Sequence, residues 1–209
     1  MSKTAPRRTD APQIYLISPP EIDAAFRDRL AAVLDAQPVA CLRLDLATQD
    51  ADRVMRAADA CREVAHARDV PLVLADHAAL VERLGVDGVH LSDARGLRKL
   101  RADWGDDPII GAHCGASRHD GLVAGENGAD YVAFGPVGAT PLGNGARAER
   151  ELFAWWSEMI ELPIVAEGAL DHDVVDSLRP VADFIALGEE IWRADDPTRA
   201  LTGYAERLT

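Results

Sequence analysis

The stretch LPIVAEGALDHDVVDSLRPVADFIALGEE, residues 162–190, decides the fold class of the chain. Two short aliphatic runs, at 164–166 and 184–187, flank a segment at 173–179 whose apolar residues recur at helical spacing. A strand, a helix and a second strand in this order imply parallel strands joined by a right-handed crossover.

The same unit recurs along the chain. Further runs typical of strands lie at 14–18, 40–44, 72–74, 88–91, 109–112 and 131–134. Helical patterns lie at 21–36, 52–68, 78–84, 97–104, 118–127, 149–161 and 198–208. Eight such units favour closure, so the sequence predicts a single (β/α)8 TIM barrel over residues 13–209, after a flexible N-terminal segment at 1–12. An open doubly wound sheet is the alternative, but no Gly-x-Gly-x-x-Gly turn follows the first strand.

The composition is that of a globular domain, with 48% hydrophobic and 27% charged residues. The formal net charge is −13, and such a surface repels nucleic acid and acidic membranes. No apolar run follows the polar first residues that could serve as a signal peptide or span a bilayer. The three cysteines occur singly, which fits a reducing compartment. We therefore expect a cytoplasmic protein without nucleic-acid or membrane partners.

Polar residues at strand ends are the candidates for function, because a barrel builds its site from the loops that follow its strands. Arg43 lies within an otherwise apolar strand, where a cation needs an anionic partner. That partner is either an anionic ligand or, in a structural ion pair, Asp76 or Glu167. His90, between Val89 and Leu91, is expected to be a hydrogen-bonded core histidine.

Three further polar residues follow strands directly. Asp76 and Asp93 could together hold a hard divalent cation such as Mg²⁺, while N-capping of a helix is the alternative for Asp76. His113 precedes a loop of small residues that leaves its ring open to a ligand, so it is the preferred general acid or base. Beside it, Cys114 is expected to be a buried thiol rather than a nucleophile.

Glycines close the last two predicted strands. Gly168 and Gly188 could bind phosphate through backbone N–H groups, as loops at this place in barrels often do. Glu167 and Glu189 flank these glycines and would oppose a phosphate unless they point away or a cation intervenes. The glycine-rich loop at 136–148 is a candidate lid over the ligand.

Four motifs resemble the thiamine-phosphate synthase and thiazole tautomerase family. They are GVDGVHL at 85–91, IIG at 109–111, GADYVAFGPVGAT at 128–140 and LPIVAEGAL at 162–170. The resemblance implies a barrel in which a synthase joins hydroxymethylpyrimidine diphosphate to a thiazole phosphate and releases pyrophosphate with magnesium. Chemistry by ion-pair or proton-transfer steps would need no organic cofactor.

Several family ligand positions carry other residues in this chain. The resemblance aligns Asp45 and Gly143 with lysines, Ala75 with an asparagine, and Glu189 with a serine. Each charge-assisted contact to a buried phosphate is worth on the order of 1.5 to 3 kcal/mol, so these replacements would weaken diphosphate binding. In the tautomerase branch a histidine of the fifth loop moves a proton, and His113 lies in that loop, before the family position.

We therefore predict a divergent family member that joins or binds the two phosphorylated heterocycles. The predicted ligand residues are Arg43, Asp76, His113, Thr140, Gly168 and Gly188, with Arg43 and His113 as the catalytic pair and Asp76 and Asp93 as Mg²⁺ ligands. The alternatives are a tautomerase-like isomerase that uses His113 and a catalytically silent ligand-binding paralogue. The sequence leaves a homodimer open.

Overall fold

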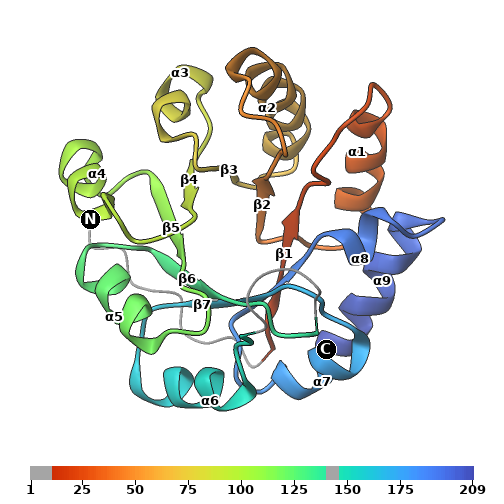
Figure 1. The fold of residues 1–209 in the computed structure, drawn as a ribbon. Helices are drawn as coiled ribbons and strands as arrows, with labels where there is room; N and C mark the ends of the chain where they lie inside the picture. The colour runs from red at the N-terminus through yellow and green to blue at the C-terminus, as the bar shows by residue number, and fades with distance from the viewer. Residues whose placement is uncertain (1–10, 140–145) are drawn as a thin grey trace.

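Eight parallel strands close into a barrel in chain order in the computed structural model, which describes residues 11–139 and 146–209 (Figure 1). The strands are β1 Gln13–Ile17, β2 Cys41–Leu44, β3 Leu72–Ala75, β4 Gly88–Leu91, β5 Ile109–His113, β6 Tyr131–Phe134, β7 Ile164–Glu167 and β8 Phe184–Leu187. Each bound lies within one residue of the prediction, and the predicted (β/α)8 barrel is confirmed. Residues 1–10 of the predicted N-terminal segment lie outside the described residues.

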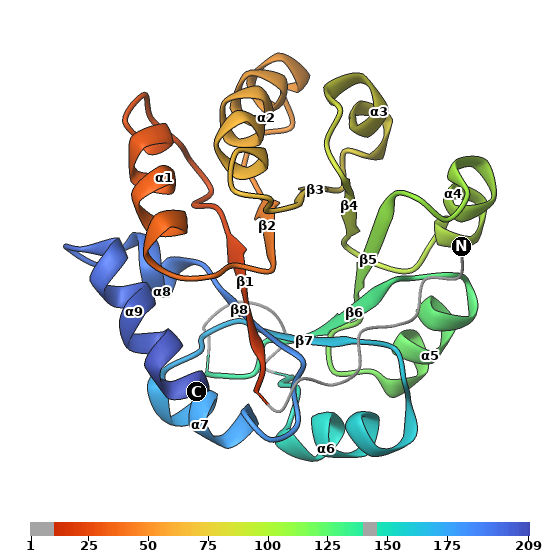
Figure 2. The same ribbon diagram turned by 180° about the vertical axis from the view of Figure 1, so that it is seen from behind.

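Helices surround the strands on the outside, as the two opposite views show (Figures 1 and 2). They are α1 Phe26–Ala36, α2 Ala51–His66, α3 Val81–Leu84 after the 3₁₀ turn Ala78–Leu80, α4 Leu97–Trp104, α5 Arg118–Glu126, α6 Arg150–Met159, α7 His172–Leu178, α8 Glu189–Trp192 and α9 Pro197–Leu208. The last helix packs on α1, α7 and α8 and so closes the outer layer. No helix of the described residues is both long and apolar enough to cross a membrane.

Aspartate caps fix where several helices begin. The side chain of Asp50 accepts hydrogen bonds from the first backbone N–H groups of α2, and Asp171 and Asp196 cap α7 and α9 in the same way. The first helix begins at Phe26 rather than at the predicted residue 21, because the side chain of Asp23 accepts from the Ala25 N–H in a turn that precedes it.

The strand register directs one set of side chains into the barrel. Arg43 is paired with Ile17 and Val73 on the neighbouring strands, and Glu167 is paired with Ala186. Residues of this parity face the barrel axis, whereas the alternate residues pack under the helices in the main hydrophobic core.

A buried polar cluster fills the middle of the barrel. The hydroxyls of Tyr15 and Tyr131 lie 2.8 Å apart. Nδ1 of His90 lies 3.0 Å from the hydroxyl of Tyr131, and the His90 ring stacks on the Tyr131 ring. Burial, and then the charge of Arg43, lower the pKa of His90 to about 3, so the ring is neutral. The prediction of a hydrogen-bonded core histidine is confirmed.

Candidate active site

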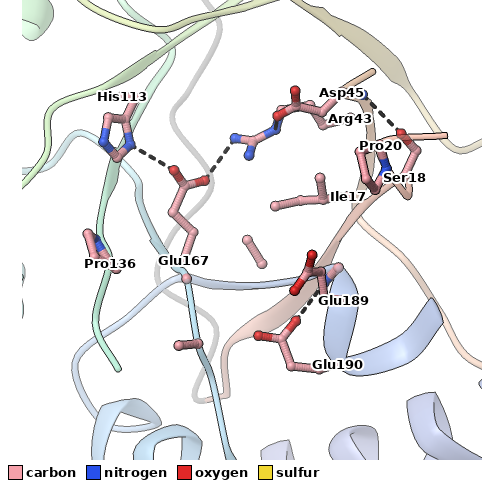
Figure 3. Close-up of a pocket in the computed structure, with 14 residues that line it drawn as sticks. Ile17, Ser18, Pro20, Arg43, Asp45, His113, Pro136, Glu167, Glu189 and Glu190 are labelled. Atoms are coloured by element: carbon pink, nitrogen blue, oxygen red, sulfur yellow. Dashed lines mark hydrogen bonds and ion pairs between the residues drawn. The ribbon is translucent and has the colours of Figure 1, made fainter. Parts of the chain in front are cut away.

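A chain of three charged or titratable side chains crosses the carboxyl end of the barrel (Figure 3). Nη1 of Arg43 donates to Oε2 of Glu167 at 2.8 Å, and Nδ1 of His113 lies 2.7 Å from Oε1 of the same carboxylate. On its other side, Nε of Arg43 lies 3.2 Å from Oδ2 of Asp45. Of the partners that the sequence left open for Arg43, the structure selects Glu167 and adds Asp45.

Burial and neighbouring charges have opposite effects on the ionisation of Arg43 and Glu167. Only 6% of Arg43 and 9% of Glu167 are exposed. Burial opposes ionisation of Glu167, but Arg43 and the contact with His113 outweigh it and hold the pKa of the carboxyl well below its ordinary value. Burial likewise opposes the charge of Arg43, yet Glu167 raises its pKa above the ordinary value. The two groups therefore form a buried ion pair.

Within the described part of the chain, one nitrogen of Arg43 and one of His113 are buried without a hydrogen bond. The contacts of Arg43 Nε and His113 Nδ1 are short, but their angles lie outside those of a hydrogen bond, so among the described residues both atoms are buried without a hydrogen-bond partner. Burial raises the pKa of Asp45, and the more distant contact with Arg43 does not outweigh it. A buried polar atom without a hydrogen bond is costly, so the contacts of Arg43 Nε and His113 Nδ1 with carboxylates offset that cost only in part.

A cavity of about 530 Å³ opens above the ion pair. It is lined by Ile17, Ser18, Pro20, Arg43, Asp45, His113, Pro136, Glu167, Gly168, Ala169, Ala186, Gly188, Glu189 and Glu190. Four predicted ligand residues thus come together at this cavity: Arg43 from β2, His113 from β5, and Gly168 and Gly188 from the loops after β7 and β8. The predicted ligand residue Thr140, the aligned position Gly143 and the middle of the predicted lid fall within 140–145, outside the described residues.

The two predicted magnesium ligands lie outside the wall of this cavity. Oδ1 of Asp76 accepts from the backbone N–H of Ser92 at 2.7 Å. Both oxygens of Asp93 accept from Arg95, from its backbone N–H at 2.7 Å and its Nε at 2.8 Å. The part of the chain that the structure describes contains no group of three or more His, Cys, Asp or Glu side chains suited to a metal ion. Both carboxylates accept backbone hydrogen bonds in this structure, and their role as Mg²⁺ ligands stays a prediction. The N-capping alternative for Asp76 does not hold either, because the residue before the 3₁₀ turn is His77, without a side-chain cap.

The loops after β7 and β8 carry the glycines expected to bind phosphate. Gly168 has a φ of +88°, and a Cβ there would lie 2.9 Å from Pro136, so the position requires glycine. The backbone N–H of Gly188 donates to Oε2 of Glu190 at 3.0 Å, and the N–H of Leu170 donates to Oε1 of the same side chain at 3.0 Å. The sequence interpretation missed Glu190, although its position directly after Glu189 in a glycine loop was a usable signal.

The two glutamates that conflicted with phosphate binding are oriented differently. Glu167 points into the cavity and is neutralised by Arg43. Glu189 lines the cavity but its carboxylate pairs with Arg193 one turn further along, at 2.8 Å, where both side chains are exposed.

A second cavity of about 770 Å³ lies on the other side of His113. Its wall includes His113, Asp93, Arg95, Arg98 and Ser117. Cys114 also borders it, but burial raises the pKa of this thiol to about 12, so it is protonated at neutral pH and matches the expected buried thiol. His113 is therefore the side chain that the two cavities share.

The order of motifs, the closed barrel and the cavity at its carboxyl end agree with one family. The profile described as thiamine monophosphate synthase matches residues 14–191. The chain belongs to this family. The thiamine-phosphate synthase of Rhodospirillum centenum is 41% identical over 86% of this chain and 89% of its own length. That of Erythrobacter litoralis is 36% identical over 94% of this chain and 95% of its own.

A solved structure of the family has the same fold. The thiamine phosphate pyrophosphorylase from Pyrococcus furiosus superposes with a TM-score of 0.83, covers 96% of each chain and is 19% identical in sequence. The resemblance drawn from the four sequence motifs is thereby confirmed at the level of family and fold.

Proposed function

We propose that the protein acts in thiamine biosynthesis as a transferase of the thiamine-phosphate synthase type. Its substrates are a hydroxymethylpyrimidine diphosphate and a thiazole phosphate. The ring nitrogen of the thiazole forms a C–N bond to the methylene carbon of the pyrimidine while the C–O bond to the diphosphate breaks. Pyrophosphate leaves with the electron pair of that bond, so the step needs neither an oxidant nor an organic cofactor.

One observation supports a reaction between two molecules: His113 lies in the walls of two cavities. A reaction that joins two substrates needs them held in contact across a short distance. On one side of His113 lie Arg43 and Glu167, and on the other lie Arg95 and Arg98. We assign the thiazole phosphate to the first cavity, because Gly168 and Gly188 border it, and the diphosphate to the second, because two guanidinium groups border it.

His113 and Arg43 are the residues that we assign to catalysis. Oε1 of Glu167 lies 2.7 Å from Nδ1 of His113 and so limits the orientation of the ring. This arrangement can hold or move a proton beside the reacting atoms. Arg43 lines the first cavity, so its charge lies beside a ligand anion bound there.

A turnover assay tests the proposal. The protein is incubated with both substrates and Mg²⁺, and thiamine phosphate and pyrophosphate are followed together. We expect the two products in equal amounts, lost in the variant His113→Asn. Pyrophosphate without thiamine phosphate, or neither product, would contradict a synthase. The magnesium requirement, implied by the resemblance, is tested by adding a chelator to this assay. The cytoplasmic location, expected from the sequence, is tested separately by fractionation of cells.

A tautomerase-type isomerisation is the second candidate, and the 2.7 Å contact between His113 and Glu167 favours it. A histidine oriented by a buried carboxylate is suited to moving a proton between two positions of one substrate. Proton exchange of the thiazole phosphate in deuterated water, without the pyrimidine, separates this activity from the synthase. Binding of the thiazole phosphate without exchange or turnover would leave a ligand-binding paralogue.

A further inference from the structure

The carboxylate of Glu190 fills the place where the loops after β7 and β8 converge. Its two oxygens each accept one backbone hydrogen bond of 3.0 Å, one from Leu170 in the loop after β7 and one from Gly188 after β8. Figure 3 shows the Glu190 side chain beside that of Glu189 at the edge of the cavity. The protein therefore already holds an anion between these two loops, and the anion is part of its own chain.

The two N–H groups are held firmly in place. Leu170 is fully buried, and its carbonyl accepts a hydrogen bond of 2.8 Å from the hydroxyl of Tyr204 on α9. The preceding Ala169 has a φ of +54°, a left-handed conformation that a residue with a side chain rarely adopts. It is packed against Gly138, whose added Cβ would lie 1.8 Å from the Ala169 carbonyl oxygen. The loop thus presents the Leu170 N–H in one orientation.

No unpaired guanidinium of this cavity competes for Glu190. Of the charged groups in the cavity wall, Arg43 is paired with Glu167 and Asp45, and Glu189 is paired with Arg193. The remaining titratable neighbour, His113, contacts Glu167. A ligand phosphate would enter a wall with four carboxylates, and Gly188, one of the two residues whose amides Glu190 occupies, belongs to that wall.

We propose that Glu190 is a specificity-determining residue that occupies the phosphate position between β7 and β8 and lowers the affinity of the cavity for phosphate esters. A phosphorylated ligand binds there only when Glu190 leaves both amides. This inference rests on the proposed function in one respect, namely that the cavity is where the thiazole phosphate binds. It names the residue that decides how tightly the phosphate is held.

Glu190 also belongs to the first turn of the short helix α8, so a purely structural cap is the competing role. The two roles predict opposite effects on phosphate affinity. A structural cap gives a less stable protein with unchanged or weaker phosphate binding once the residue is replaced. An internal competitor gives tighter phosphate binding, because the two N–H donors become free for the ligand.

The test is calorimetric titration of the full chain with inorganic phosphate and with the thiazole phosphate. The variant Glu190→Gln removes the charge and one acceptor with little change in shape, and Glu190→Ala vacates the position. The matched control Glu189→Gln removes a neighbouring charge of the same cavity without freeing either amide. We expect both Glu190 variants to bind the two phosphates roughly tenfold to a hundredfold more tightly than the wild type. The control should change the affinity by a much smaller factor.

Equal effects of Glu189→Gln and Glu190→Gln would overturn the proposal, because general electrostatics would then explain them. Unchanged or weaker binding in Glu190→Gln would overturn it as well. If Glu190→Ala does not fold, the conservative Gln variant carries the test. The unphosphorylated thiazole alcohol serves as a further probe, and we expect its affinity to stay unchanged in all variants.

This outcome is separable from that of the proposed function. The titrations measure equilibrium binding and do not depend on product formation. Tighter phosphate binding in Glu190→Gln together with no thiamine phosphate from the wild type would sustain the role of Glu190 and reject the synthase. Product formation by the wild type together with unchanged phosphate affinity in Glu190→Gln would sustain the synthase and reject the role of Glu190.

Discussion

The guanidinium of Arg43 donates to the carboxylate of Glu167 across the mouth of the barrel, at 2.8 Å, although the two residues are 124 positions apart in the chain. Both are largely buried, so each charge has lost most of its hydration. The Coulomb attraction in such surroundings must offset the loss of hydration of both groups. The pair links β2 to β7 and, through Glu167, holds His113 on β5.

Breaking this pair from one side should destabilise the fold strongly. In Glu167→Gln the charge of Arg43 stays buried without its main partner, and we expect the free energy of unfolding to fall by about 3 to 5 kcal/mol. Urea denaturation followed by circular dichroism measures the loss. Replacing both partners together, Arg43→Met with Glu167→Leu, should restore most of the stability while it abolishes ligand binding. A double variant as unstable as the single one would show that the attraction itself stabilises the fold.

The buried His90 should make the protein sensitive to mild acid. Its folded-state pKa of about 3 lies below the ordinary value of 6.5, so between these pH values the unfolded chain binds a proton that the folded chain does not. Stability should therefore fall as the pH falls from 6.5 toward 3, by up to about 1.4 kcal/mol per pH unit from this residue. Urea unfolding of wild type and His90→Gln between pH 7.5 and 5 measures the difference. The slope should flatten in this variant and stay unchanged in His119→Gln, where the histidine is exposed.

The assignment of His113 to catalysis predicts a split between turnover and binding. Asn at this position cannot move a proton, so kcat should fall by about a hundredfold to ten-thousandfold. The affinity for the thiazole phosphate should change far less, because its phosphate is assigned to the loops after β7 and β8. Steady-state kinetics and titration of His113→Asn are compared with the surface variant His119→Asn. A loss of affinity as large as the loss of kcat would assign His113 to binding instead.

Gly111 makes room for the polar cluster inside the barrel. A Cβ at this position would lie 2.0 Å from the Tyr131 ring, and that ring is fixed by hydrogen bonds to Tyr15 and His90. We expect Gly111→Ala to cost about 1 to 3 kcal/mol of stability. The opposite sign is expected for Gly203→Ala in α9, where an added Cβ has no neighbour within 4 Å, with a gain of about 0.5 to 1 kcal/mol. Thermal melts of the two variants measure both effects, and equal shifts of the melting temperature would contradict this account of packing.

The periodicity of apolar residues was sufficient to predict the barrel and each strand. A strand in a closed parallel barrel is apolar on both faces, and helical spacing separates one strand from the next, so local patterns carry the topology. The position of polar residues and glycines at strand ends then identified Arg43, His113, Gly168 and Gly188 among the residues that line the cavity. His113 and Glu167 are the last residues of β5 and β7 rather than the first residues beyond them, so strand ends were one residue too short in the prediction.

The pairing of charges could not be predicted, because it depends on the register between strands and on loop backbones. Arg43 had a ligand and two carboxylates as open partners, and only the geometry of the barrel mouth selects Glu167. The role of Glu190 depends on the left-handed conformation of Ala169, which no local pattern indicates in a residue that is not glycine. The pairing of Asp76 and Asp93 was predicted on spacing alone, and spacing could not show that Asp76 accepts from Ser92 in the next loop or that Asp93 accepts from Arg95 in its own.

A crystal structure of the protein with bound thiamine phosphate tests the central claim most directly. We predict the heterocycles beside His113 and Arg43, with the phosphate between Gly168 and Gly188 and the Glu190 side chain moved away from both amides. Thiamine phosphate bound elsewhere, or excluded from the cavity at saturating concentration, would contradict the account.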